Sequence, residues 1–136
     1  MFKTFLLLTV LLIFSSVTVD ARPVINETQA VTDSFVNLSS ATALNSTAGM
    51  EINASKDNRL IVSIANTAEA AGLNVTAEAG SYFRSGLGNL TLTIPASTTR
   101  LIGPLESSRF EQPDGKIYFS FNNTNGTAIG YRLPTS

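Results

Sequence analysis

Residues 73–79 (LNVTAEA), 90–94 (LTLTI) and 117–121 (IYFSF) decide the fold class. In each stretch apolar side chains alternate with polar ones, which is the period of a β-strand with one face in a core. Residues 59–65 (RLIVSIA) are apolar on both faces, as in a central strand or one that a partner covers. No long helical period competes with these patterns, so the sequence predicts a protein built from strands.

Turn residues recur every 8 to 12 residues from about Met50 onward, which is the spacing of a small antiparallel sandwich. Asp114-Gly115 and Asn125-Gly126 are hairpin-type pairs. We therefore predict an all-β protein with a single antiparallel β-sandwich of about seven or eight short strands. The candidate strands are Met50–Ala54, Arg59–Ala65, Leu73–Ala79, Leu90–Ile94, Thr99–Ile102, Ile117–Phe121 and Thr127–Leu133.

The first 21 residues have the pattern of a secretory signal peptide. Lys3 supplies a positive start, an apolar run follows from Phe5, and Val19-Asp20-Ala21 resembles a small-residue cleavage site. A membrane anchor would need about 20 apolar residues, more than this run offers. A pilin-type signal, cleaved before the apolar run, is a further alternative. We expect cleavage after Ala21, with contact to the membrane only during export.

Residues 22–49 are predicted to form an N-terminal arm and a loop rich in Ser, Thr and Asn, and residues 50–136 the sandwich domain. The arm has an extended start at Pro23 and a candidate strand at Phe35–Leu38. No cysteine is present, so packing, sheet hydrogen bonds or assembly must stabilise the domain. The net charge is −1, which gives no basic field for nucleic acid or anionic lipid.

Eight Asn-X-Ser/Thr triplets follow the signal, and none has proline in the middle. Random placement of the same residues would give roughly 2.5 such triplets. N-linked glycans are added on the export side and cover surface, so we expect a secreted glycoprotein located outside the cell or at its surface. The alternation of the strands predicts that Asn74, Asn89 and Asn122 point outward. Asn125 lies in a tight turn directly after the Asn122 triplet, and crowding is expected to leave it unmodified. The acceptor residues are Asn26, Asn37, Asn45, Asn53, Asn74, Asn89, Asn122 and Asn125.

Catalytic residue types are scarce in this chain. It contains no His, the usual general base, and no Cys, the residue that supplies a thiolate nucleophile. These two residue types are also the common ligands of transition metals. Glu69 and Glu78 are acidic, but nothing in the sequence pairs them as acid and base. We predict no enzyme, no catalytic residue, no metal site and no cofactor other than covalent N-glycans. The aromatic residues near the loop from Tyr82 to Asn89 suit either sheet packing or a platform for carbohydrate.

The stretches RLIVSIANT (59–67), LTLTIPASTTRLIGPLESSRFEQPDGKIYFSF (90–121) and AIGYRL (128–133) resemble small β-sandwich accessory proteins of tailed-phage virions. The shared pattern runs through a Leu-Ile-Gly-Pro corner at Leu101 to Pro104 and covers roughly residues 57–133. This resemblance implies a noncatalytic subunit that joins an assembly. The export signal, the arm and the dense triplets depart from a virion protein and indicate the cell exterior.

Exported glycosylated sandwiches with an extended arm also resemble subunits of archaeal and bacterial surface filaments that join by donor-strand exchange. That resemblance implies an arm that completes the sheet of the next copy. Alternatively, the arm forms the first strand of its own domain. The candidate arm residues are Val24, Ile25, Val31, Phe35, Val36 and Leu38.

The leading hypothesis is a noncatalytic secreted structural glycoprotein that self-assembles into an extracellular filament, sheath or surface layer, with other copies of itself as partners. The alternative is a monomeric cell-surface adhesion or carbohydrate-binding module, whose candidate ligands are surface glycans. Nucleic acid is not expected as a partner of either.

Overall fold

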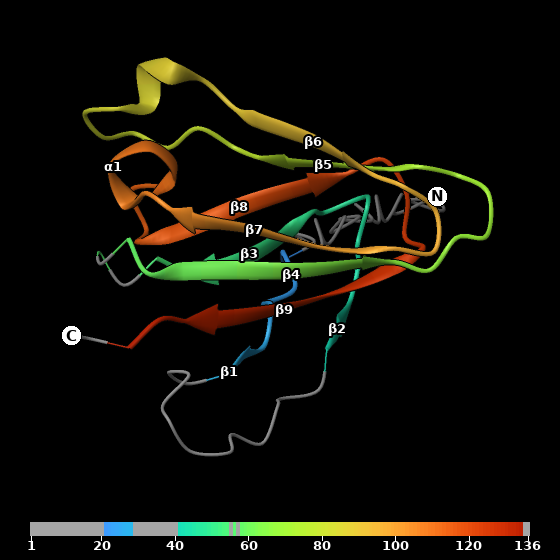
Figure 1. Ribbon diagram of the computed structural model, residues 1–136. Helices are drawn as coiled ribbons and strands as arrows, with labels where there is room; N and C mark the ends of the chain where they lie inside the picture. Colours follow the sequence, from blue (N-terminus) through green and yellow to red (C-terminus); the bar gives the residue numbers. More distant parts are fainter. Residues whose placement is uncertain (1–20, 29–40, 55, 57, 135–136) are drawn as a thin grey trace, which may run out of the picture.

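The computed structural model describes residues 21–28, 41–54, 56 and 58–134 (Figure 1). Most of the predicted signal peptide and the candidate strand Phe35–Leu38 lie outside these residues. So do the acceptor Asn37 and the arm residues Val31, Phe35, Val36 and Leu38. None of the described helices has the length and hydropathy of a membrane span.

The described residues form two sheets that face each other, which confirms the predicted all-β sandwich (Figure 1). The β9 sheet contains β1 (Glu27–Thr28), β9 (Gly126–Arg132), β4 (Leu60–Asn66) and β7 (Thr99–Leu105) in this order, with β2 (Thr42–Ala43) also beside β9. The β8 sheet has the order β3 (Met50–Asn53), β8 (Lys116–Phe121), β5 (Leu73–Ala77) and β6 (Leu90–Ile94). All of these strand pairs are antiparallel except β1 with β9.

Alternation along the strands builds the core. Every second residue of β4, β5 and β8 is buried, and these residues meet between the two sheets. Phe119, at the centre of β8, is fully buried. The largest fully buried side chains are Phe119, Ile25, Met50, Ile52, Leu60, Ile64, Leu73, Ile94, Leu105, Ile117, Val62 and Val75.

The sheets extend beyond the segment from Met50 that the sequence assigned to the sandwich. The short strands β1 and β2 both pair with β9. Between them and the β8 sheet, Val24 makes a parallel bridge to Glu51 of β3, and Ile25 is only 1% exposed. The described part of the arm thus closes one side of the sandwich, and β6 and β7 form the open edges of the other side.

The two ends of the sandwich carry different connections, an irregular segment at one end and two short helices with a loop at the other (Figure 1). The connection 67–72 follows β4 and precedes β5 at one end. The other end holds the β3–β4 loop, the 3₁₀ helix η1 (Ser85–Leu87) and the short helix α1 (Ser107–Phe110). Since β5 runs the length of the sheet between 67–72 and the η1 loop, these two connections lie at opposite ends.

Candidate functional site

The outer face of the β8 sheet is polar and holds two of the predicted glycan acceptors. The strand register places these outward residues side by side across β3, β8, β5 and β6: Glu51, Asn53, Lys116, Tyr118, Ser120, Asn74, Thr76, Thr91 and Thr93. Asn89 directly precedes β6 and Asn122 directly follows β8. All four acceptors are exposed: Asn53, Asn74, Asn89 and Asn122. The predicted outward orientation of Asn74, Asn89 and Asn122 is therefore confirmed.

Three further acceptors lie beside β9. Asn26 and Asn125 are exposed, and Asn45 is half-buried.

The register also reveals a neighbour relation that the sequence does not show, because the backbone N–H of Asn74 donates to Oδ1 of Asn122 at 2.9 Å. These two acceptors are 48 residues apart in the chain and adjacent on the surface.

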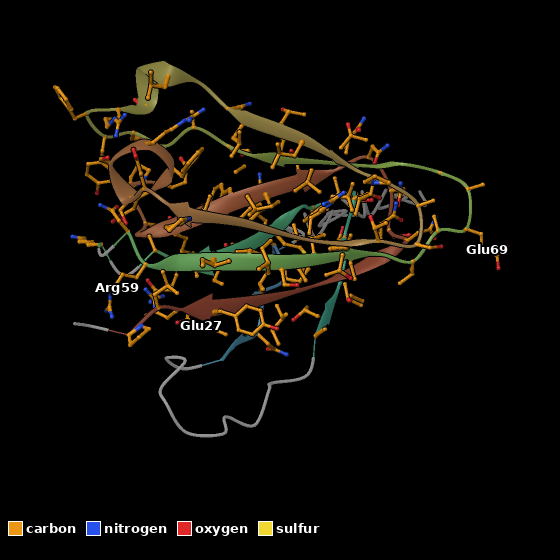
Figure 2. The ribbon with its side chains drawn as sticks, viewed as in Figure 1. Glu27, Arg59 and Glu69 are labelled. Atoms are coloured by element: carbon orange, nitrogen blue, oxygen red, sulfur yellow. The ribbon has the colours of Figure 1, made fainter. Side chains whose placement is uncertain are left out.

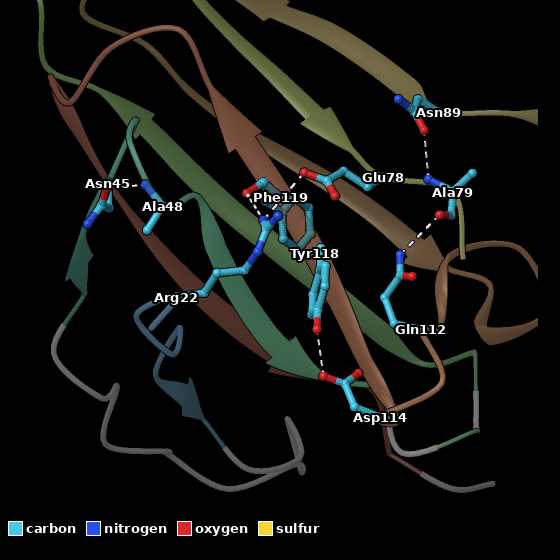
Figure 3. A network of polar contacts seen from close by, with 10 residues as sticks. All are labelled: Arg22, Asn45, Ala48, Glu78, Ala79, Asn89, Gln112, Asp114, Tyr118 and Phe119. Atoms are coloured by element: carbon cyan, nitrogen blue, oxygen red, sulfur yellow. Dashed lines mark hydrogen bonds and ion pairs between the residues drawn. The ribbon is translucent and has the colours of Figure 1, made fainter. Parts of the chain in front are cut away.

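The side-chain amides of several acceptors are held in one orientation. Oδ1 of Asn89 accepts from the Ala79 backbone N–H at 2.8 Å (Figure 3), and Oδ1 of Asn45 accepts from Thr47 and Ala48 N–H at 3.0 and 2.9 Å. Because a backbone N–H can pair only with the amide oxygen, this contact fixes which side of the amide faces the protein. The Nδ2 atoms of Asn45, Asn89 and Asn122, where a glycan would be attached, make no hydrogen bond to described residues.

Replacing Asn89 by glutamine is expected to lower the mass of the exported protein by one glycan, because glutamine is not an acceptor. Intact-mass analysis before and after deglycosylation measures this change. Asn123→Gln is the matched control, since it leaves the Asn122 triplet intact and should change the mass only by the substitution itself. An unglycosylated wild-type mass would contradict the prediction for every site.

Arg22 fastens the start of the arm to the outer face of the β8 sheet (Figure 3). Its Nη1 lies 3.4 Å from Oε1 of Glu78, and its guanidinium carbon lies 4.4 Å from the centre of the Tyr118 ring. The Tyr118 hydroxyl donates to Oδ2 of Asp114 at 2.6 Å. This hydrogen bond lowers the pKa of Asp114 and raises that of Tyr118. Arg22 therefore belongs to a polar cluster of its own domain.

The next residues of the arm are also paired within the domain. Ile25 N–H donates to the Glu51 carbonyl at 2.8 Å, and Glu51 N–H donates to the Pro23 carbonyl at 3.0 Å. Arg132 binds both carboxylate oxygens of Glu27, at 2.6 and 2.9 Å. Of the six candidate arm residues, the structure describes Val24 and Ile25, and their segment forms part of its own sandwich. The Val24 side chain remains 58% exposed.

An apolar tip stands at the end of the sandwich that carries α1. It consists of Tyr82, Phe83 and Leu87, which are all exposed, and Phe83 is 98% exposed. Tyr82 and Phe83 line a hollow of about 340 Å³ together with Lys56 and residues of α1. A second hollow of about 300 Å³ lies between Phe83 and Leu87. The aromatic residues of this loop are thus on the surface and not in the core.

Backbone hydrogen bonds hold the tip against α1. Gly80 N–H donates to the Arg109 carbonyl at 2.8 Å, Ser81 N–H to the Glu111 carbonyl at 3.0 Å, and Arg84 N–H to the Ser108 carbonyl at 2.9 Å. Gly80 allows this close approach, because a Cβ there would lie 2.0 Å from the Glu111 carbonyl oxygen. Arg84 adds an ion pair with Glu106 at 2.6 Å. Three apolar side chains are therefore presented on a braced loop.

The outer face of the β9 sheet is apolar at its centre. Ile61 and Tyr131 are paired across β4 and β9, and they line a hollow of about 350 Å³ with Leu101 and Leu133. Leu101 is 68% exposed. None of the seven described acceptors lies on β4 or β7 or within β9. We call this surface the bare face.

Glu69 and Glu78 do not lie together as an acid and base pair. Glu69 lies in the connection before β5 and Glu78 follows this strand, so the two carboxylates are at opposite ends of the sheet. Among residues 21–28, 41–54, 56 and 58–134, no group of three or more His, Cys, Asp or Glu could hold a metal ion. Near α1, Ser107 Oγ and Glu111 Oε1 are buried without a hydrogen-bond partner in the described structure.

Sequence reasoning missed the architecture around α1. Four residues are too few to show a helical period, and the hollow forms only where the β3–β4 loop, the η1 loop and α1 meet.

Comparison of the chain with models of protein families, with curated proteins and with solved structures finds no match.

Proposed function

We propose that the protein is a noncatalytic structural glycoprotein of the cell exterior that self-assembles into a filament, sheath or surface layer. The observation that carries this proposal is the difference between the two outer faces. The polar face of the β8 sheet and its ends hold Asn53, Asn74, Asn89 and Asn122, whereas the bare face holds Ile61, Leu101 and Tyr131. Contiguous exposed apolar surface commonly marks a protein interface. Glycans on the β8 sheet and beside β9, with contacts between copies on the bare face, are compatible in such an assembly.

The anchored arm fits the expected export route. Cleavage after Ala21 would leave Arg22 at the start of the mature chain, in contact with Glu78 and Tyr118. The mature domain would then retain Ile25 in its core and the Glu27–Arg132 pair at its edge. The described part of the arm is thus used within its own domain. The surfaces left for contacts between copies, among the described residues, are the bare face, the open edges and the ends of the sandwich.

Electron microscopy of the native exported material, with intact-mass analysis of the same sample, tests the proposal. Ordered polymers that carry several glycans are the expected result. Monodisperse monomers would overturn self-assembly and favour the alternative, a monomeric adhesion or carbohydrate-binding module. For that alternative the Tyr82–Phe83 hollow is the candidate ligand site, and Phe83→Ala would weaken saccharide binding.

Replacing Leu101 by lysine is expected to abolish lateral association of copies through the bare face, because a charge would be buried in an apolar contact. The measurement is the size distribution by light scattering and electron microscopy. Val24→Lys is the matched control, because Val24 is a similarly exposed aliphatic residue outside the bare face. Loss of assembly with Val24→Lys alone would point to the arm and contradict a role for the bare face.

A further inference from the structure

The two ends of the sandwich offer different surfaces. One end, which we call the head, carries the apolar tip of Tyr82, Phe83 and Leu87. The other end, which we call the tail, is the connection 67–72 between β4 and β5. In Figure 2, Glu69 projects from the tail, at the far end of the molecule from α1. Head-to-tail polymerisation joins two such different surfaces of identical subunits.

The head is apolar, prominent and rigid. Phe83 is almost completely exposed, although the loop around it is tied to α1 by three backbone hydrogen bonds and the Arg84–Glu106 ion pair. Association through a braced loop needs little ordering of the backbone, which lowers the entropic cost of contact. The head therefore has the character of a binding surface.

The tail presents small side chains and is equally well held. Ala70, Ala71 and Gly72 are exposed, so a bulky aromatic ring of another molecule can approach closely. Asn66 fixes this connection, because its Nδ2 donates to the Ala71 carbonyl at 2.8 Å and its Oδ1 accepts from Ala68 N–H at 3.0 Å. Ser97 N–H donates to the Ala68 carbonyl at 3.0 Å.

Opposite charges flank these two surfaces. Lys56 lines the hollow beside Tyr82 and Phe83 at the head, and Glu69 is exposed at the tail. Neither has an ion-pair partner among the described residues. We propose that the head of one copy binds the tail of the next, with Phe83 against Ala70 and Ala71 and Lys56 beside Glu69. This inference rests on the proposed self-assembly and names the contact that would make it linear.

A head-to-tail contact is heterologous, since it joins two different surfaces of identical subunits. Each bound copy leaves one free head and one free tail, so growth continues unless the rotation between copies closes a ring. The ends used here lie along the strand direction, so the contact does not cover the centre of the polar face of the β8 sheet. Asn89 lies at the head end of that sheet and Asn122 at its tail end. The bare face remains available for contacts between neighbouring chains of subunits.

Charge reversal tests this contact in the full-length exported protein. Lys56→Glu and Glu69→Lys should each weaken end-to-end association by more than about tenfold, because like charges would meet across the contact. A mixture of the two single variants should polymerise again, since each head then meets a tail of opposite charge, and so should the double variant. Sedimentation velocity and electron microscopy measure polymer length.

Phe83→Ala is the independent variant and should also shorten the polymers, while thermal unfolding stays unchanged. If the wild type polymerises and the single charge-reversal variants polymerise equally well, the head-to-tail contact is overturned. The proposed self-assembly then still stands. Failure of both the mixture and the double variant to recover polymers would overturn the Lys56–Glu69 pairing. A monomeric wild type would overturn the proposed function, and this inference with it.

Discussion

Replacing Phe119 by alanine is expected to destabilise the domain by about 3–5 kcal/mol, the usual cost of removing a buried phenylalanine ring. Phe119 is fully buried between the sheets and faces Met50 and Ala77 across its strand neighbours. Domains of this size have a free energy of unfolding of only about 5–15 kcal/mol. Without cysteines, no disulfide supports the fold. Urea or thermal unfolding followed by circular dichroism measures the loss.

Phe83→Ala is the matched control for this prediction. The same ring is removed from a site that is 98% exposed, so the free energy of unfolding should change by less than about 0.5 kcal/mol. Equal destabilisation by the two variants would contradict the described packing. The control also establishes that any effect of Phe83→Ala on polymer length is not caused by unfolding.

Asn66→Ala is expected to cost about 2–4 kcal/mol, because one side chain satisfies several buried or part-buried backbone groups and each orphaned buried group costs about 1–3 kcal/mol. Asn66 is 2% exposed, and its Nδ2 donates to the carbonyls of Ala71, Ile94 and Pro95 at 2.8, 3.0 and 3.2 Å. These bonds join the tail to the turn between β6 and β7. Denaturant unfolding measures the cost, and polymer length should fall with it as the tail loosens.

Asn66→Asp should not rescue stability. A carboxylate still accepts from Ala68 N–H but turns its second oxygen toward three carbonyl oxygens. Asn123→Ala is the control, since its side chain is more exposed and its bonds are to neighbouring residues of one turn. A loss of similar size in Asn123→Ala would contradict the special role of Asn66. Neither Asn66 nor Asn123 is a predicted glycan acceptor, so neither substitution removes a predicted glycosylation site.

Strand positions followed from the sequence because each strand has one face in the core. All seven strands predicted from Met50 onward are present, and the bounds of β6 are those predicted. The prediction ended β7 at Ile102, before Gly103-Pro104, whereas the strand continues to Leu105. Proline is tolerated there because β7 is an edge strand, whose outer side needs no hydrogen-bond donor.

The candidate surfaces were predictable only in part. Alternation correctly turned Asn74, Asn89 and Asn122 outward, since it depends on local geometry alone. The contact between Asn74 and Asn122, the bare face and the hollow beside Phe83 depend on segments far apart in the chain. The arm illustrates the same limit, because its sequence suited pairing within the domain and pairing between copies equally well.

The sequence by itself determined the class of fold, the outward direction of acceptors in the strands and the absence of histidine and cysteine chemistry. These properties depend on residue type and on the period of two along a strand. Only the tertiary structure decided that Val24 and Ile25 pair within their own domain, that Glu69 and Glu78 lie apart, and that Tyr82, Phe83 and Leu87 share one exposed tip. Strand order and loop placement bring distant residues together, and a periodic pattern carries no information about which strands become neighbours.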